Sequence, residues 1–217
     1  MYNIFKSILI AAIISSNLFS IDLKEIDSRI LNYIKMDTCK LIDRKYYTVC
    51  WNFEKNVAES GWTIIDPAYM NTGNINKRSS FYKDKEVQTL SPIQIKNPLH
   101  KGHTFAKDED FDYIQESLKS TYNMINITPM YGKINIGIWR KIENRGRTLA
   151  KDFGPIISIT KISYTDDSKF GIPAGKYPKE FIRIYIGSNF EECYKSGNDI
   201  NENNNLLEHK IECKEIK

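Results

Sequence analysis

The amino-acid sequence predicts an α+β domain, an antiparallel sheet with helices packed on it. Short stretches rich in β-branched and aromatic residues predict the strands. One longer stretch near residue 140 has the apolar spacing of a helix, and no internal repeat or heptad pattern is present. The chain has 217 residues, 41% hydrophobic and 27% charged, which suits one folded domain and excludes general disorder.

The N-terminal segment is distinct from the rest of the chain. Lys6 is its one charged residue, residues 8–14 form an apolar run of seven, and the small residue Ser20 ends it. This pattern predicts a signal peptide over residues 1–20, followed by a single domain over residues 21–217. The alternative, an uncleaved spanning helix, needs roughly 18 to 20 apolar residues. We therefore expect a secreted or periplasmic protein whose mature form has no membrane segment.

The four cysteines all follow the predicted cleavage site. They are Cys39, Cys50, Cys193 and Cys213. An even number in an exported chain predicts two disulfides, for which three pairings exist. Local closure favours Cys39–Cys50 and Cys193–Cys213. A zinc site is the alternative, but no C-x-x-C spacing or nearby histidine supports it.

The N-terminal half of the mature chain predicts one helix and one hairpin. Residues 21–36 have apolar residues near helical spacing, which predicts an amphipathic helix packed on the domain. Residues 46–51 and 62–65 are rich in β-formers and flank a polar stretch, so they predict a β-hairpin. Residues 66–100 are polar with scattered proline, asparagine and glycine, and predict an irregular loop.

The C-terminal half predicts a long helix and two strands. Residues 135–151 form the clearest helix, ended by Asp-Phe-Gly-Pro at residues 152–155. Residues 156–163 predict a strand. Residues 181–186 predict another, buried on both faces because its apolar residues hardly alternate with polar ones. Residues 195–205 are rich in asparagine and predict a loop.

The basic residues are distributed unevenly. The formal net charge is +4, which is compatible with a polyanionic partner. Of seven arginines, three lie within eight residues of the predicted long helix: Arg140, Arg145 and Arg147. Arginine holds phosphate through two parallel hydrogen bonds. The alternative interpretation is an ordinary solvated face of the helix.

Two of the three histidines flank a glycine in His100-Lys101-Gly102-His103. Imidazole is the usual general base near neutral pH, and lysine can hold a phosphate oxygen as a point charge. Glycine lets the backbone turn sharply beside a ligand. The alternative is a turn that carries exposed polar residues.

A third group of polar residues follows along the predicted long helix. Asn135, Glu143 and Arg147 are spaced so that a regular helix places them roughly on one side. An asparagine carbonyl is a hard oxygen ligand suited to Mg²⁺, which takes few protein ligands and keeps most of its waters. Glu143 can orient such a water. A Glu143–Arg147 surface ion pair is the alternative.

The order and spacing of these pieces resemble a known family. The run H-K-G-H, followed by N-I-T-P-M-x4-N-x3-W-x3-E-x3-R from Asn126 to Arg147, resembles the DNA/RNA non-specific endonucleases of the ββα-metal class, relatives of mitochondrial endonuclease G. Upstream, Arg78, Phe81 and Asp84 resemble that family's R-x2-F-x2-D segment. The resemblance covers roughly residues 46–185.

The resemblance implies a ββα-metal active site with assigned roles. His103 matches the general base, and Asn135 matches the sole direct protein ligand of a Mg²⁺ or Mn²⁺ ion. Glu143 matches the acid that holds metal-bound water, and Asn126 the residue that braces the site. The expected phosphate contacts, in addition, are Arg147, Arg78 and Lys101. The implied substrate is DNA and RNA, cut with little sequence specificity because backbone contacts dominate.

Three positions depart from the family pattern. His100 and Lys101 stand where the family has Asp and Arg, and Met130 stands where it has Gln. These departures leave open a second interpretation, a nuclease fold that binds nucleic acid without cutting it. A third interpretation is an exported structural protein with a basic surface.

Overall fold

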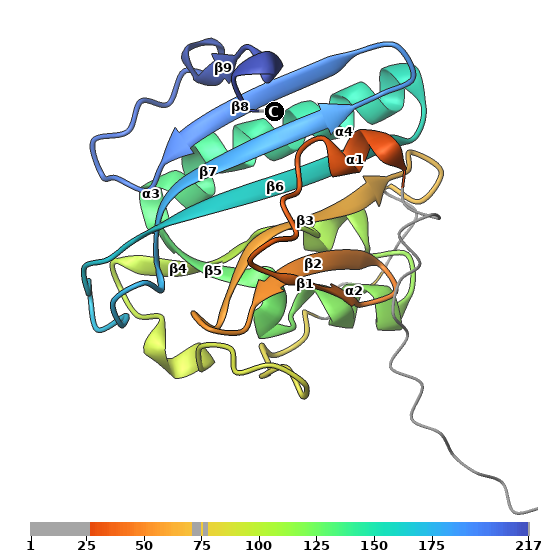
Figure 1. Cartoon of the computed structure of the whole chain (residues 1–217). Helices are drawn as coiled ribbons and strands as arrows, with labels where there is room; N and C mark the ends of the chain where they lie inside the picture. Colours follow the sequence, from red (N-terminus) through yellow and green to blue (C-terminus); the bar gives the residue numbers. More distant parts are fainter. Residues whose placement is uncertain (1–26, 71–74, 76–77, 217) are drawn as a thin grey trace, which may run out of the picture.

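The computed structural model describes residues 27–70, 75 and 78–216 (Figure 1). Within this part of the chain, seven strands form an antiparallel sheet in the order β1-β2-β3-β6-β7-β8-β9, and two more strands, β4 and β5, pair separately. Their bounds are β1 Lys40–Asp43, β2 Tyr47–Asn52, β3 Val57–Ile65, β4 Leu99–His103, β5 Ile127–Tyr131, β6 Ile156–Thr165, β7 Tyr177–Ile186, β8 Glu191–Gly197 and β9 Lys210–Ile211. The predicted α+β class with an antiparallel sheet is confirmed.

The predicted hairpin is formed by β2 and β3. Tyr47 pairs with Thr63 and Asn52 with Val57, so the polar stretch between the strands shrinks to a short turn. The sequence prediction missed β1, which pairs with β2 along its whole length. The described residues from Asp66 to Pro98 are largely irregular, as predicted, with a short 3₁₀ turn at Pro92–Gln94. The predicted loop ends two residues early, because β4 begins at Leu99.

The central strands β6 and β7 extend beyond their predicted ranges. In β7, Phe181 and Tyr185 belong to one apolar core, whereas Ile184 and Ile186 belong to a second core on the opposite face. Side chains alternate across a strand, so β7 is covered on both faces, as its sequence predicted. The predicted loop at residues 195–205 is wrong at its start, because β8 continues to Gly197 and pairs with β7.

The N-terminal helix is shorter than predicted. Only α1, Ser28–Leu31, is helical in the described part of the predicted range 21–36. Asp27 caps its first turn by accepting a hydrogen bond from the Arg29 amide. The apolar residues Ile30 and Ile34 still pack on the sheet. The predicted signal peptide lies outside the described residues.

The long helix begins earlier than predicted and is not regular. Helix α3, Gly132–Ile134, continues through a π-helical turn at Asn135–Trp139 into α4, Arg140–Phe153, which ends at Gly154. The backbone of Gly137, inside the π turn, is not helical. Helix α4 passes behind the strands in the view of Figure 1, whereas α1 lies in front of them. The remaining helix is α2, Gln115–Thr121, followed by a 3₁₀ turn at Met124–Asn126.

Both predicted disulfides are present. Cys39 is bonded to Cys50 and Cys193 to Cys213, with Cα–Cα distances of 5.3 Å in each pair. The zinc alternative is therefore wrong, because no thiol is free. Both bridges join the apolar core on the α1 face of the sheet. The opposite face packs against α4 and the π turn. None of the described helices is long and apolar enough to span a membrane.

Candidate active site

The H-K-G-H run forms strand β4 rather than a turn. It pairs with β5, so that His100 lies opposite Met130 and His103 opposite Ile127. The sequence alone favoured a turn because a glycine and three polar residues interrupt any apolar pattern. The pairing partner lies more than twenty residues further along the chain.

Gly102 does not form a sharp turn. Instead, its lack of a side chain allows strand β4 and the π turn to approach each other. A Cβ atom at this position would lie 2.5 Å from Met130 Sδ and 3.0 Å from Asn135 Oδ1. Neither gap leaves room for a side chain. The absence of one brings the amide oxygen of Asn135, on the π turn, against the strand residue next to His103.

The ring of His103 lies in an aromatic surrounding. Its centroid is 5.4 Å from that of Tyr122, which it meets edge to face, and 6.1 Å from that of Phe81. The ammonium group of Lys101 lies 5.6 Å from the centre of the Phe81 ring. The structure therefore brings together His103, Lys101 and the segment that follows Arg78.

The backbone around His103 is fixed from three sides. Trp139 Nε1 donates a hydrogen bond to the carbonyl oxygen of His103 over 3.0 Å. The carbonyl oxygen of Thr104 accepts hydrogen bonds from Thr160 Oγ1 at 2.8 Å and Arg183 Nη2 at 2.9 Å. Sequence reasoning missed Thr160 and Arg183. Their only signal was polar residues inside strands that are otherwise apolar.

Asn126 braces the loop that follows β4. Its side-chain oxygen accepts hydrogen bonds from the amides of Phe105 and Ala106, and its amide nitrogen donates to the carbonyl oxygens of Ala106 and Thr121. The side chain is fully buried. With four hydrogen bonds, it fixes where the chain goes after His103 but has no capacity left for a substrate.

Asn135 has the properties of a ligand for a hard cation. Its side chain is half-buried, and none of the described residues makes a hydrogen bond to it. An amide oxygen of this kind suits Mg²⁺ held mainly by water. The described residues contain no group of three or more His, Cys, Asp or Glu side chains able to hold an ion on their own. The donor set therefore fits a largely hydrated ion. π turns recur at functional sites, and Asn135 is the first residue of this one.

Glu143 and Arg147 belong to a charged cluster with the loop after β4. Glu143 is 7% exposed and lies 3.3 Å from Lys107 Nζ. Arg147 forms ion pairs with Glu109 at 2.7 Å and with Asp110 at 3.0 Å. Two carboxylates thus already engage the guanidinium group that the sequence assigned to phosphate. Of its neighbours in the arginine run, Arg145 pairs with Glu192 and Arg140 is exposed.

The cluster shifts the acidity of its members. Burial raises the pKa of Asp110 to about 7, with a further increase from Glu143, and the positive charge of Arg147 offsets this only in part. Burial would lower the pKa of Lys107, but the charges of Glu143, Glu109 and Asp110 outweigh it and raise the pKa. Sequence reasoning missed Asp110, because its partners are distant along the chain.

A match to a family model identifies the family of this chain. The model of the DNA/RNA non-specific endonucleases matches residues 30–214. The chain belongs to the DNA/RNA non-specific endonuclease family. It is therefore a nuclease, an enzyme that hydrolyses phosphodiester bonds in nucleic acid, and its family depends on divalent metal ions.

A solved structure supports the fold of this nuclease. A chain in the crystal structure of the EndoG/EndoGI complex, described as showing the mechanism of EndoG inhibition, matches with a TM-score of 0.71 at 14% sequence identity. The match covers 87% of this chain and 86% of that one. No curated protein matches the sequence.

Proposed function

We propose that the mature protein is an exported, Mg²⁺-dependent endonuclease that cuts DNA and RNA with little sequence preference. The contact at Gly102 carries this proposal. It places the Asn135 amide oxygen, from the π turn, beside the strand that ends in His103. This proximity supports one site shared by a general base and a metal ligand from two distant parts of the sequence.

His103 acts as the general base. The hydrogen bond from Trp139 to its carbonyl oxygen, together with the bonds of Asn126 to the following loop, fixes the backbone that carries the ring. A neutral imidazole so placed takes a proton from water as the water attacks the phosphorus atom. The fixed geometry contributes to the rate, because the reaction slows steeply when the general base is misplaced.

Asn135 would hold the metal ion, and Glu143 would provide a carboxylate that can accept hydrogen bonds from water near it. When bound, a Mg²⁺ or Mn²⁺ ion supplies positive charge that stabilises the developing negative charge on the phosphate and leaving oxygen. Lys107 keeps Glu143 in place through their ion pair.

Lys101 and Arg78 contact the phosphate backbone. Both are positively charged, and Lys101 lies over the Phe81 ring beside His103. Arg147 would have to exchange Glu109 for a substrate phosphate in order to contribute, so we assign it first to the charged cluster. Contacts to the backbone carry no sequence information, which accounts for low specificity.

The decisive experiment incubates the oxidised mature protein with plasmid DNA and with RNA, with EDTA or with added Mg²⁺ or Mn²⁺. Degradation of both nucleic acids only with metal supports the proposal. A gel shift of intact DNA with and without metal would instead support the alternative, a nuclease fold that binds without cutting.

The two histidines provide a matched pair of variants. His103→Ala should lose roughly 10²- to 10⁴-fold in cleavage rate, the range for a general base, with DNA binding kept. His100 is exposed and lies against Gly132 at the start of α3. His100→Ala should therefore lose much less, and His100→Asp should be tolerated because a carboxylate suits a helix N-terminus. The reverse ranking would overturn the assignment of the base.

Export is tested separately from catalysis. The mature N-terminus should begin near Ile21, and protein from the periplasm or medium should show no titratable thiol without reductant. N-terminal sequencing and a thiol assay measure both. A mature chain that begins at Met1, or that has four free thiols, would contradict export.

A further inference from the structure

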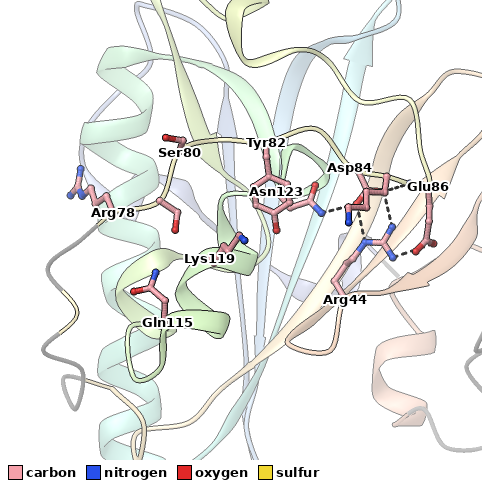
Figure 2. A pocket seen from close by; sticks show the side chains of 11 residues that line it. Arg44, Arg78, Ser80, Tyr82, Asp84, Glu86, Gln115, Lys119 and Asn123 are labelled. Atoms are coloured by element: carbon pink, nitrogen blue, oxygen red, sulfur yellow. Dashed lines mark hydrogen bonds and ion pairs between the residues drawn. The ribbon is translucent and has the colours of Figure 1, made fainter.

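A large cavity lies beside His103, on the other side of one chain segment. Its volume is about 910 Å³, within the range for a site that holds a small ligand. The segment that follows Arg78 forms one side and α2 another (Figure 2). Ser79, Ser80 and Tyr82 line the cavity, whereas Phe81 contacts the His103 ring.

The two sides of the cavity differ in how their charges are used. On one side, Arg44 is bound by Asp84 at 2.9 Å and by Glu86 at 3.4 Å, and Asn123 donates a further hydrogen bond to Asp84. This side is a closed network (Figure 2). On the other side, Arg78 and Lys119 form no ion pair with any of the described residues. Lys85, between Asp84 and Glu86, also lines the cavity and forms no ion pair with the described residues. The positive charge available in the cavity suits an anion.

Tyr82 gives the cavity a fixed aromatic surface. Its amide donates to the carbonyl oxygen of Tyr122, and its own carbonyl oxygen accepts from the Met124 amide, so the backbone is held to the segment after α2. Its ring is half-buried and extends into the cavity. Burial and the charge of Asp84 raise the pKa of the phenol, which stays neutral.

These features match the chemistry of unpaired nucleic acid. Proteins that hold single strands combine a positive groove for the backbone with aromatic side chains on which bases stack. Here Arg78 and Lys119 supply the charge and Tyr82 the ring, while Ser80 and Gln115 add polar groups that can meet any base edge. In a duplex, paired and stacked bases cannot reach a ring recessed in a cavity.

We propose that this cavity binds one unpaired nucleotide next to the scissile phosphate, so that the enzyme favours single-stranded or unwound substrate. The inference rests on the proposed function of the His103 site. It adds Tyr82 and Lys119 as residues that contact substrate. The strand would cross the segment at Phe81, from the cavity to His103.

The test measures binding without cleavage. A fluorescent 12-nucleotide single strand and the matching 12-base-pair duplex are titrated in EDTA with the oxidised mature protein. Tyr82→Leu should weaken single-strand binding roughly 5- to 150-fold, the contribution of one stacked base, and duplex binding less than twofold. Tyr82→Phe keeps the ring and should bind as wild type. Lys119→Gln should weaken single-strand binding and lower its dependence on log salt by about one unit.

Lys179→Gln is the matched control, since this exposed lysine on β7 does not line the cavity and loses the same charge. Melting temperatures check that each variant is folded. If Tyr82→Leu and Lys119→Gln bind the single strand as tightly as Lys179→Gln does, the proposal is wrong. Metal-dependent plasmid cleavage by the wild type is scored separately. A protein that binds through this cavity but does not cut would contradict the proposed function and leave the cavity assignment standing.

Discussion

The two faces of the large sheet are built from different kinds of residue. On the α1 face, Ile157 and Ile184 pack with both disulfides in an apolar core. On the α4 face, the neighbouring positions in the same strands hold Ser158, Thr160 and Arg183, all buried. Arg183 bonds to Ser158 and, with Thr160, to the Thr104 carbonyl oxygen next to His103. Both faces contain an apolar core, but the α4 face in addition contains buried polar groups that position the site.

The largest expected effect is the loss of activity, without loss of stability, in a variant on the α4 face. Asn135→Ala should abolish cleavage while leaving the melting temperature near that of the wild type. The variant loses one metal ligand and gains a better helix former. Plasmid cleavage and thermal unfolding measure the two outcomes. Normal turnover by this variant would place the metal elsewhere.

A variant on the α1 face should show the opposite result, a loss of stability without a loss of activity. The double variant Cys193→Ser/Cys213→Ser should lower the free energy of unfolding by about 2 to 5 kcal/mol, because the bridge restrains the unfolded chain. Its cleavage rate at a temperature where it is folded should match the wild type. Denaturant titration and initial rates measure both. A large loss of rate in folded protein would show that the two faces are coupled.

Arg183 tests whether a buried polar group on the α4 face serves position rather than stability. It forms no ion pair with any of the described residues, and its guanidinium lies 4.7 Å from the centre of the Trp139 ring. Arg183→Met should change the free energy of unfolding little, since the loss of the hydrogen bonds to Ser158 and Thr104 is offset by the removal of a buried charge that has no ion-pair partner among the described residues. It should lower kcat about tenfold with KM unchanged, because His103 loses a support.

Arg183→Lys is the conservative control. A lysine can still donate to the Thr104 carbonyl oxygen, so part of kcat should return. Equal losses in both variants, or a fall in stability that accounts for the lost activity, would assign Arg183 to the fold alone.

The last expected effect concerns pH. Burial raises the pKa of Asp110 to about 7 from 3.8, so the folded protein holds this proton over a window in which the unfolded chain has lost it. The free energy of unfolding should therefore decrease as the pH rises between these two values. Asp110→Asn should remove that part of the decrease, as measured by denaturant unfolding at pH 5 and pH 8. Parallel pH profiles of the two proteins would contradict the assignment.

How much the sequence predicted depends on how local each feature was. The disulfides and the β2–β3 hairpin involve neighbours along the chain, and both were predicted correctly. The pairing of β4 with β5 was missed because its two strands are far apart and Gly102 interrupts the pattern. The ion pairs of Arg147 were missed for the same reason, since Glu109 and Asp110 come from the loop after β4. The prediction of a helix over residues 21–36 was mostly wrong in the described part of that range. The same apolar spacing also fits a largely non-helical segment that packs on the sheet through Ile30 and Ile34.

The π turn changes the direction in which Asn135 points relative to α4. A regular helix over the same residues would point this side chain elsewhere. A π turn is in effect an α-helix with one residue inserted. Each residue of an α-helix turns the chain by about 100°, so deleting Gly137 would rotate Asn135 away from Gly102 by roughly that angle relative to α4. A shortened helix would be more regular, yet its first turn would face the wrong way. One additional residue thus sets the direction in which the side chain of Asn135 points.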